Sequence, residues 1–152
     1  MLSYDFCAND FYGGDASKFG EVRAAAVRCL ELQTNETLNT IMLQLVQAFR
    51  YENFRNPTLG KFLLKCTAKD ETLANAFHWY VKVEKDNKDA SEKMRNEYER
   101  LYNMFFDKIT EENPAIADLL DGQLELRGKL LDVSNYIKQL KKEKIAGKKK
   151  AL

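Results

Sequence analysis

Two helix-length stretches, residues 43–52 and 73–84, constrain the fold of this chain more than any other feature. Each has apolar residues at the spacing of one helical face, with an aromatic residue and an acid towards its end. Each also follows another helix-like segment, so we expect helix pairs lying side by side. Such pairs are typical of a scaffold rather than of a catalytic centre.

Composition favours a single globular domain. The chain has 152 residues, of which 45% are apolar and 31% charged. This length allows one domain with a sizeable core. The 24 basic residues nearly balance the 23 acidic ones, so net charge gives no sign of nucleic-acid binding. No alternating apolar run bounded by turn residues is long enough to predict a strand.

Turn signals and apolar periodicity divide the chain into about six helices. Asn35 and Asp70 are predicted N-caps, and the Asn56-Pro57 and Asn113-Pro114 pairs mark helix starts. The predicted helices cover residues 18–33, 35–54, a short stretch after Pro57, and residues 70–85, 90–109 and 114–144. The predicted fold class is all-α, an α-α superhelix of antiparallel helix pairs like the ARM and HEAT solenoids.

Several buried positions follow from this pattern. The helix from Asp70 has apolar residues around much of its circumference, so Trp79 or Tyr80 is expected in the core. The first helix is expected to bury Val22, Ala25, Ala26, Cys29, Leu30 and Leu32. The terminal helices of such a stack are expected to expose apolar surface unless something covers them. The last helix carries its apolar stripe on Ile116, Leu119, Leu120, Leu124, Leu126, Leu130, Leu131, Val133, Ile137 and Leu140.

The three cysteines, Cys7, Cys29 and Cys66, are isolated and show neither disulfide nor zinc-site spacing. We expect reduced, buried thiols in a cytoplasmic protein. No stretch has the apolar length needed to span a bilayer, and the first residues lack the basic region of a signal peptide.

The sequence offers little catalytic chemistry. A kinase needs a glycine-rich phosphate loop, a lysine and acidic metal ligands, and no such set is found. The glycines of residues 12–15 fit an irregular turn. His78 is the only histidine, and its aromatic neighbours indicate a packed or half-exposed helical residue. We therefore predict no catalytic residue, no cofactor-binding residue and no metal ligand.

The C-terminal segment is rich in lysine. Such a cluster can attract anionic lipid, whereas a solvated helix end is the simpler interpretation, because lysines also suit the negative pole of a helix. The cluster consists of Lys138, Lys141, Lys142, Lys144, Lys148, Lys149 and Lys150.

Three ordered blocks, residues 22–27, 43–54 and 73–84, resemble the helical accessory (PIK) domain of phosphatidylinositol 3-kinases, closest to class III, the vacuolar protein sorting lipid kinase. The similarity runs from about Phe19 to the lysine cluster. His78 occupies a position where that family usually carries another aromatic residue.

The resemblance implies three regions: an irregular segment over residues 1–18, a helical domain over 19–144, and a lysine-rich tail over 145–152 leading towards an absent kinase domain. In that family the domain is a non-catalytic scaffold between a C2 domain and the kinase domain. The parent enzyme makes phosphatidylinositol 3-phosphate for endosomal trafficking and autophagy. It is peripheral on endosomal membranes, takes ATP and Mg²⁺ in its kinase domain, and can bind a regulatory subunit.

Three other interpretations remain open. The chain could be a free-standing helical-repeat adaptor with a protein partner. It could be the helical domain of another phosphatidylinositol kinase class. A small enzyme using His78 is the third.

Overall fold

The structure, a computed structural model, describes the backbone of residues 16–150 and the side chains of residues 20–141. It contains seven α-helices, one 3₁₀ turn and no strand within these limits, which confirms the all-α prediction. Most of the predicted irregular segment lies outside the described residues. The elements are α1 (Ala16–Glu31), α2 (Asn35–Thr40), α3 (Met42–Ala48), the 3₁₀ turn η1 (Phe49–Tyr51), α4 (Thr58–Thr67), α5 (Glu71–Lys85), α6 (Glu92–Glu112) and α7 (Pro114–Lys150).

The second predicted helix is broken at Ile41, which separates α2 from α3. Ile41 has φ −105° and ψ 8°, outside the helical region. Thr40 and Ile41 are consecutive β-branched residues, and the Thr40 hydroxyl donates to the Glu36 carbonyl at 2.9 Å. Both features weaken a helix, because β-branched side chains crowd the preceding turn and the hydroxyl competes for backbone groups.

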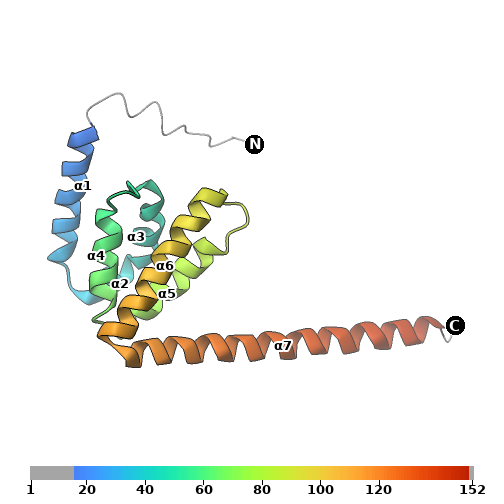
Figure 1. Ribbon diagram of the computed structural model, residues 1–152. Helices are drawn as coiled ribbons and strands as arrows, with labels where there is room; N and C mark the ends of the chain where they lie inside the picture. Colours follow the sequence, from blue (N-terminus) through green and yellow to red (C-terminus); the bar gives the residue numbers. More distant parts are fainter. Residues whose placement is uncertain (1–15, 151–152) are drawn as a thin grey trace.

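The helices form two layers (Figure 1). In one layer α1, α4 and α6 lie side by side, and in the other α2 and α3 pack on α5, which contacts α7. If α2 and α3 are counted as one broken helix, each helix up to α5 contacts the next but one along the chain. This is the packing of stacked helix pairs, in which each pair covers the face of its neighbour.

Side-chain caps fix several helix starts. Thr34, rather than the predicted Asn35, caps α2, because its hydroxyl accepts from the Thr37 N–H at 3.2 Å. The predicted cap at Asp70 is confirmed, with Oδ1 accepting from the Leu73 N–H at 2.9 Å. The Asn35 amide instead donates to Asp70 Oδ2 at 2.9 Å. This hydrogen bond joins the N-termini of α2 and α5.

Helix α5 lies at the centre of the core. Its Phe77 ring meets Phe105 of α6 edge-on, with ring centroids 5.0 Å apart. Contacts of this kind stabilise the core beyond the burial of apolar area. The largest fully buried side chains are Met42, Val46, Leu63, Thr67, Leu73, Phe77, His78, Val81, Tyr98, Phe105, Ile109 and Leu120.

The predicted core residue of α5, Trp79 or Tyr80, is not fully buried, although Tyr80 packs against the core. Trp79 and Tyr80 are only half-buried, and the fully buried residue between them and Phe77 is His78. The Trp79 indole N–H donates to Gln123 Oε1 of α7 at 2.9 Å. The inward stripe of α5 passes through positions 73, 77, 78, 81 and 84, so it leaves both aromatic residues to one side.

The predicted buried face of α1 is mostly wrong, because only Leu30 of that set packs against the core. Val22 is 68% exposed and Leu32 84%, whereas Val27 is buried. As the terminal helix of its layer, α1 packs mainly on α4, and only a narrow strip is covered. Cys29 is exposed, contrary to the expectation of buried thiols, while Cys66 is half-buried and Cys7 lies outside the described residues.

Candidate functional site

The acids near the ends of the two central sequence blocks are structural. Glu84 of α5 is buried and accepts two hydrogen bonds from Arg50 Nη2 of η1, at 3.1 Å and 3.0 Å. Nearby, the Tyr98 hydroxyl donates to the Val46 carbonyl at 2.8 Å. Burial raises the pKa of Tyr98 to about 12. These contacts join the end of α3 to α5 and α6.

The second acid, Glu52, holds the start of α4. Pro57 at the N-cap of α4 provides no side-chain acceptor, and Glu52 Oε2 accepts from the Leu59 N–H at 3.2 Å. Arg23 of α1 lies 3.7 Å from Glu52 Oε1. Burial raises the pKa of Glu52, although the Leu59 N–H and Arg23 oppose that shift. Sequence reasoning missed both roles, because the basic partners lie 29 and 34 residues away and spacing gives no sign of them.

His78 is enclosed by aromatic rings. Its Nδ1 lies 3.3 Å from the Tyr102 hydroxyl, and the ring centroids of Trp79, Tyr102 and Phe106 lie 4.7 to 5.7 Å away. Burial, with a smaller effect of Lys82, lowers the pKa of His78 to about 4. The imidazole is therefore neutral at pH 7 and packs in the core. Among the side chains described, no cluster of three His, Cys, Asp or Glu residues could hold a metal ion.

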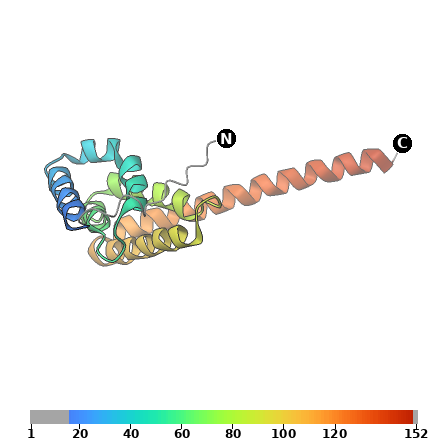
Figure 2. The ribbon, with the colours of Figure 1, turned by 90° about the horizontal axis from the view of Figure 1, so that it is seen from above.

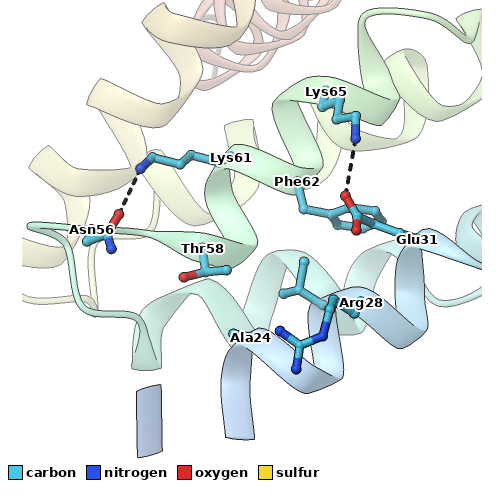
Figure 3. Close-up of a pocket in the computed structure, with 9 residues that line it drawn as sticks. Ala24, Arg28, Glu31, Asn56, Thr58, Lys61, Phe62 and Lys65 are labelled. Atoms are coloured by element: carbon cyan, nitrogen blue, oxygen red, sulfur yellow. Dashed lines mark hydrogen bonds and ion pairs between the residues drawn. The ribbon is translucent and has the colours of Figure 1, made fainter. Parts of the chain in front are cut away.

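A hollow of about 420 Å³ lies between α1 and α4 (Figure 3). Arg28 of α1 and Lys61 of α4 lie on opposite sides of it, and the Phe62 ring lies between the two helices. Lys65 forms an ion pair with Glu31 across the helices at 3.2 Å. Lys61 donates to the Asn56 side-chain oxygen at 2.7 Å. The sequence pattern did not single out this hollow.

Helix α7 leaves the body of the domain (Figures 1 and 2). The predicted apolar stripe is buried only at its beginning, where Ile116 and Leu120 meet the core and Leu124 is half-buried. Nothing in the described part of the chain lies beside the outer half of the helix, so the rest of the stripe is exposed, as expected for a terminal helix of a stack. Its exposed large apolar residues are Leu119, Leu126, Leu130, Leu131, Val133, Tyr136, Ile137 and Leu140.

Five of these residues form a regular row, which we call the α7 row: Leu126, Leu130, Val133, Ile137 and Leu140. They alternate four-residue and three-residue spacings, and they are between 39% and 62% exposed. This spacing places them on one side of a helix, as in the seam of a coiled coil. The row lies about a third of a turn away from the face that packs on the core.

The lysine cluster lies on the last turns of α7, which continues as a helix to Lys150. Side chains are described only as far as Lys141, so most of the cluster falls outside them. No helix in the described range has an apolar stretch long enough to cross a membrane.

The two-layered stack of helices, with an exposed apolar row on α7, defines an all-α domain of stacked helix pairs. The chain belongs to the phosphoinositide 3-kinase family, because residues 16–115 match the accessory domain (PIK domain) of that family. This accessory domain is a non-catalytic part of lipid kinases. The resemblance stated from the three sequence blocks is thereby confirmed.

Three similar proteins are named phosphatidylinositol 3-kinase, in agreement with this family. Phosphatidylinositol 3-kinase 1 of Dictyostelium discoideum is 33% identical over 121 residues, which cover 80% of this chain and 7% of that protein. Phosphatidylinositol 3-kinase pik3 of Schizosaccharomyces pombe is 31% identical over 128 residues, covering 80% of this chain and 16% of that protein. Phosphatidylinositol 3-kinase VPS34 of Arabidopsis thaliana is 38% identical over 81 residues, covering 53% of this chain and 10% of that protein.

The chain thus spans at most 16% of the length of these three relatives. No solved structure matches the chain significantly.

Proposed function

We propose that this chain is the helical scaffold domain of a class III phosphatidylinositol 3-kinase, packed between the C2 and kinase domains of its parent enzyme. The relative named VPS34 and the resemblance of the three sequence blocks to class III support that choice of class. The parent would phosphorylate phosphatidylinositol for endosomal trafficking and autophagy, as a peripheral protein of endosomal membranes. ATP and Mg²⁺ would bind in its kinase domain.

The α7 row is the observation that carries this proposal. Contiguous exposed apolar surface in a folded protein marks a contact with another protein segment, and a terminal helix of a stack needs such a cover. The family assignment places the chain within a much longer enzyme, so the cover is a neighbouring domain of the same parent. The kinase domain is the proposed occupant, because the resemblance to class III enzymes implies that the helical domain packs against it.

Binding in trans tests the assignment. The chain and the separately purified kinase domain of its parent are mixed, and their association is measured by calorimetry. Leu130→Asp and Ile137→Asp, which place a charge in the row, should each weaken association at least tenfold. Asn135→Asp adds the same charge on the opposite side of α7 and should leave it within twofold. Equal effects of all three variants would contradict the proposal.

The parent gene separates the alternatives. A reading frame that continues after Leu152 into a kinase domain supports the scaffold, whereas a stop codon there supports a free-standing adaptor. The class is tested on the parent enzyme, whose product from phosphatidylinositol vesicles should be phosphatidylinositol 3-phosphate. A 4-phosphate product would instead place the parent among the phosphatidylinositol 4-kinases.

Membrane contact through the lysine cluster is a subsidiary part of the proposal. Removing residues after Gln139 should abolish any binding of the chain to anionic vesicles, and added salt should weaken it, because screening shortens the reach of exposed charges. Vesicle binding that survives the deletion would contradict this part.

A further inference from the structure

We propose that the trough between α1 and α4 binds an acidic peptide segment that inserts an apolar side chain between the two helices. The trough is the hollow of Figure 3 together with a second hollow beside it. This binding site is separate from the α7 row, so the inference goes beyond the scaffold function and does not rest on it.

The two hollows form one elongated surface. The first has a volume of about 420 Å³ and the second about 230 Å³, and both are lined by Glu31, Phe62 and Lys65. Val27 and Phe62 are buried beneath the first hollow, and the buried Leu38 lines the second. The floor is therefore apolar at several points along α4, which suits an aliphatic or aromatic side chain of a peptide.

The rim of the trough is basic. Lys61 and Lys65 lie about one helical turn apart on α4, Lys69 follows just after the end of that helix, and Arg28 lies on α1. Among the described side chains, Glu31 is the only acidic residue that lines either hollow, and it is already paired with Lys65.

Within the described part of the chain, most of this positive charge has no partner of opposite sign. Among residues 20–141, no carboxylate lies within ion-pairing distance of Arg28, Lys61 or Lys69, and Lys61 contacts only the neutral Asn56 amide. Complementarity of charge therefore selects an acidic partner and would steer its approach.

The spacing of these cations argues for a peptide. They are spread along more than two helical turns with apolar surface between them, whereas a single phosphate group needs donors that converge on one point. An extended or helical segment with acidic residues on both sides of an apolar residue matches this arrangement.

Fluorescence anisotropy tests the proposal on the full chain. The probe is a labelled 12-residue peptide of glutamate and serine with one central leucine. One control peptide replaces each glutamate with glutamine, and another replaces the leucine with alanine. We expect the chain to bind the first peptide with a micromolar dissociation constant that rises with salt, and to bind each control peptide at least tenfold more weakly.

Variants locate the peptide on the surface. The double reversal Arg28→Glu with Lys61→Glu should weaken binding at least tenfold, and so should Ala24→Phe, which fills the hollow without changing charge. The matched control, Lys88→Glu with Lys93→Glu, makes the same change of charge on exposed residues before and within the first turn of α6. It should alter binding less than twofold.

Three results would overturn the proposal. The first is that the Arg28 and Lys61 double variant binds the peptide as tightly as the parent protein. The second is that the control double variant loses as much affinity for the peptide as the Arg28 and Lys61 double variant. The third is that the chain binds phosphatidylserine vesicles instead of the peptide and that this binding depends on Arg28 and Lys61. Circular dichroism of each variant shows that the fold is kept. Should Ala24→Phe fail to fold, the charge-reversal pair and its control still decide the question.

Discussion

Two buried carboxylates stabilise the start of α4 and the contact between η1 and α5. Glu52 accepts a backbone N–H at the start of α4, and Glu84 accepts both hydrogen bonds from Arg50. Each acid would cost free energy on burial without its partners, because a buried charge must be paired and hydrogen-bonded. The recurring acid in the sequence blocks therefore reflects packing rather than catalysis.

The pair of Arg50 and Glu84 should show strong energetic coupling. Arg50→Met leaves a buried carboxylate without its partner and should lower the free energy of unfolding by about 1 to 3 kcal/mol. In a double-mutant cycle with Glu84→Gln, we expect a coupling of about 1 kcal/mol or more. Urea denaturation of the four proteins measures it. Additive effects of the two substitutions would show that the pair contributes nothing specific.

His78 should make the stability of the domain depend on pH. The pKa of its imidazole is about 4 when folded, below the ordinary value of 6.5. Protons therefore bind the unfolded chain more strongly, and stability present above pH 6.5 is lost as the pH falls towards 4. The loss should reach about 2 kcal/mol at pH 5.

The variant His78→Phe supplies the matched control, because an aromatic ring of similar size keeps the packing and has no titrating group. Between pH 7 and 5, the variant should not show the loss of stability that protonation of His78 causes. The raised pKa of Glu52 acts in the opposite direction, stabilising the fold as the pH falls, and this effect remains in the variant. Denaturation curves at several pH values compare the two proteins. Parallel pH profiles of the two proteins would contradict the assignment.

At the scale of the helices, the sequence predicted where helices begin better than it predicted which face of each helix is buried. The starts of α5 and α7 follow from Asp70 and from Asn113-Pro114, because caps and prolines act locally. The break at Ile41 was missed, since two β-branched residues only weaken a helix and tertiary packing decides the outcome. The buried faces of α1 and α7 depend on which helices lie beside them, and periodicity alone does not contain that information.

Gly60 of α4 gives a test of helix packing. A Cβ atom there would lie 2.9 Å from Phe49 Cε2 and 3.3 Å from Pro57 Cβ. The Phe49 ring is held between Phe54 and Tyr98, each 5.4 Å away between centroids, and has little room to move. Gly60→Ala should therefore lower the free energy of unfolding by about 1 kcal/mol, because overpacking exceeds the gain in helix propensity.

Gly122→Ala is the matched control, since a Cβ atom at Gly122 meets nothing within 4 Å. It should raise the free energy of unfolding by about 0.5 kcal/mol through helix propensity alone. Both values come from chemical denaturation. If both substitutions stabilise the protein, the close contact at Gly60 does not have the assigned effect.

At the scale of the whole molecule, the stack leaves two surfaces without a partner among the residues that the structure describes. The α7 row extends beyond the last helix that could cover it, and the basic trough lies between the first two helices of its layer. The sequence predicted the family and the stacked helices, since the three blocks carry both. It did not predict the trough, because Arg28 and Lys61 come together only when α1 packs on α4.

The central claim is that this domain works inside a larger lipid kinase with its α7 row covered by a neighbouring domain. Hydrogen–deuterium exchange of the parent enzyme and of this chain alone tests it most directly. The backbone amides of residues 126–140 should exchange at least tenfold more slowly in the parent, because packing suppresses local opening of the helix. Equal exchange of these amides in both proteins, with α5 equally protected in each, would contradict the claim.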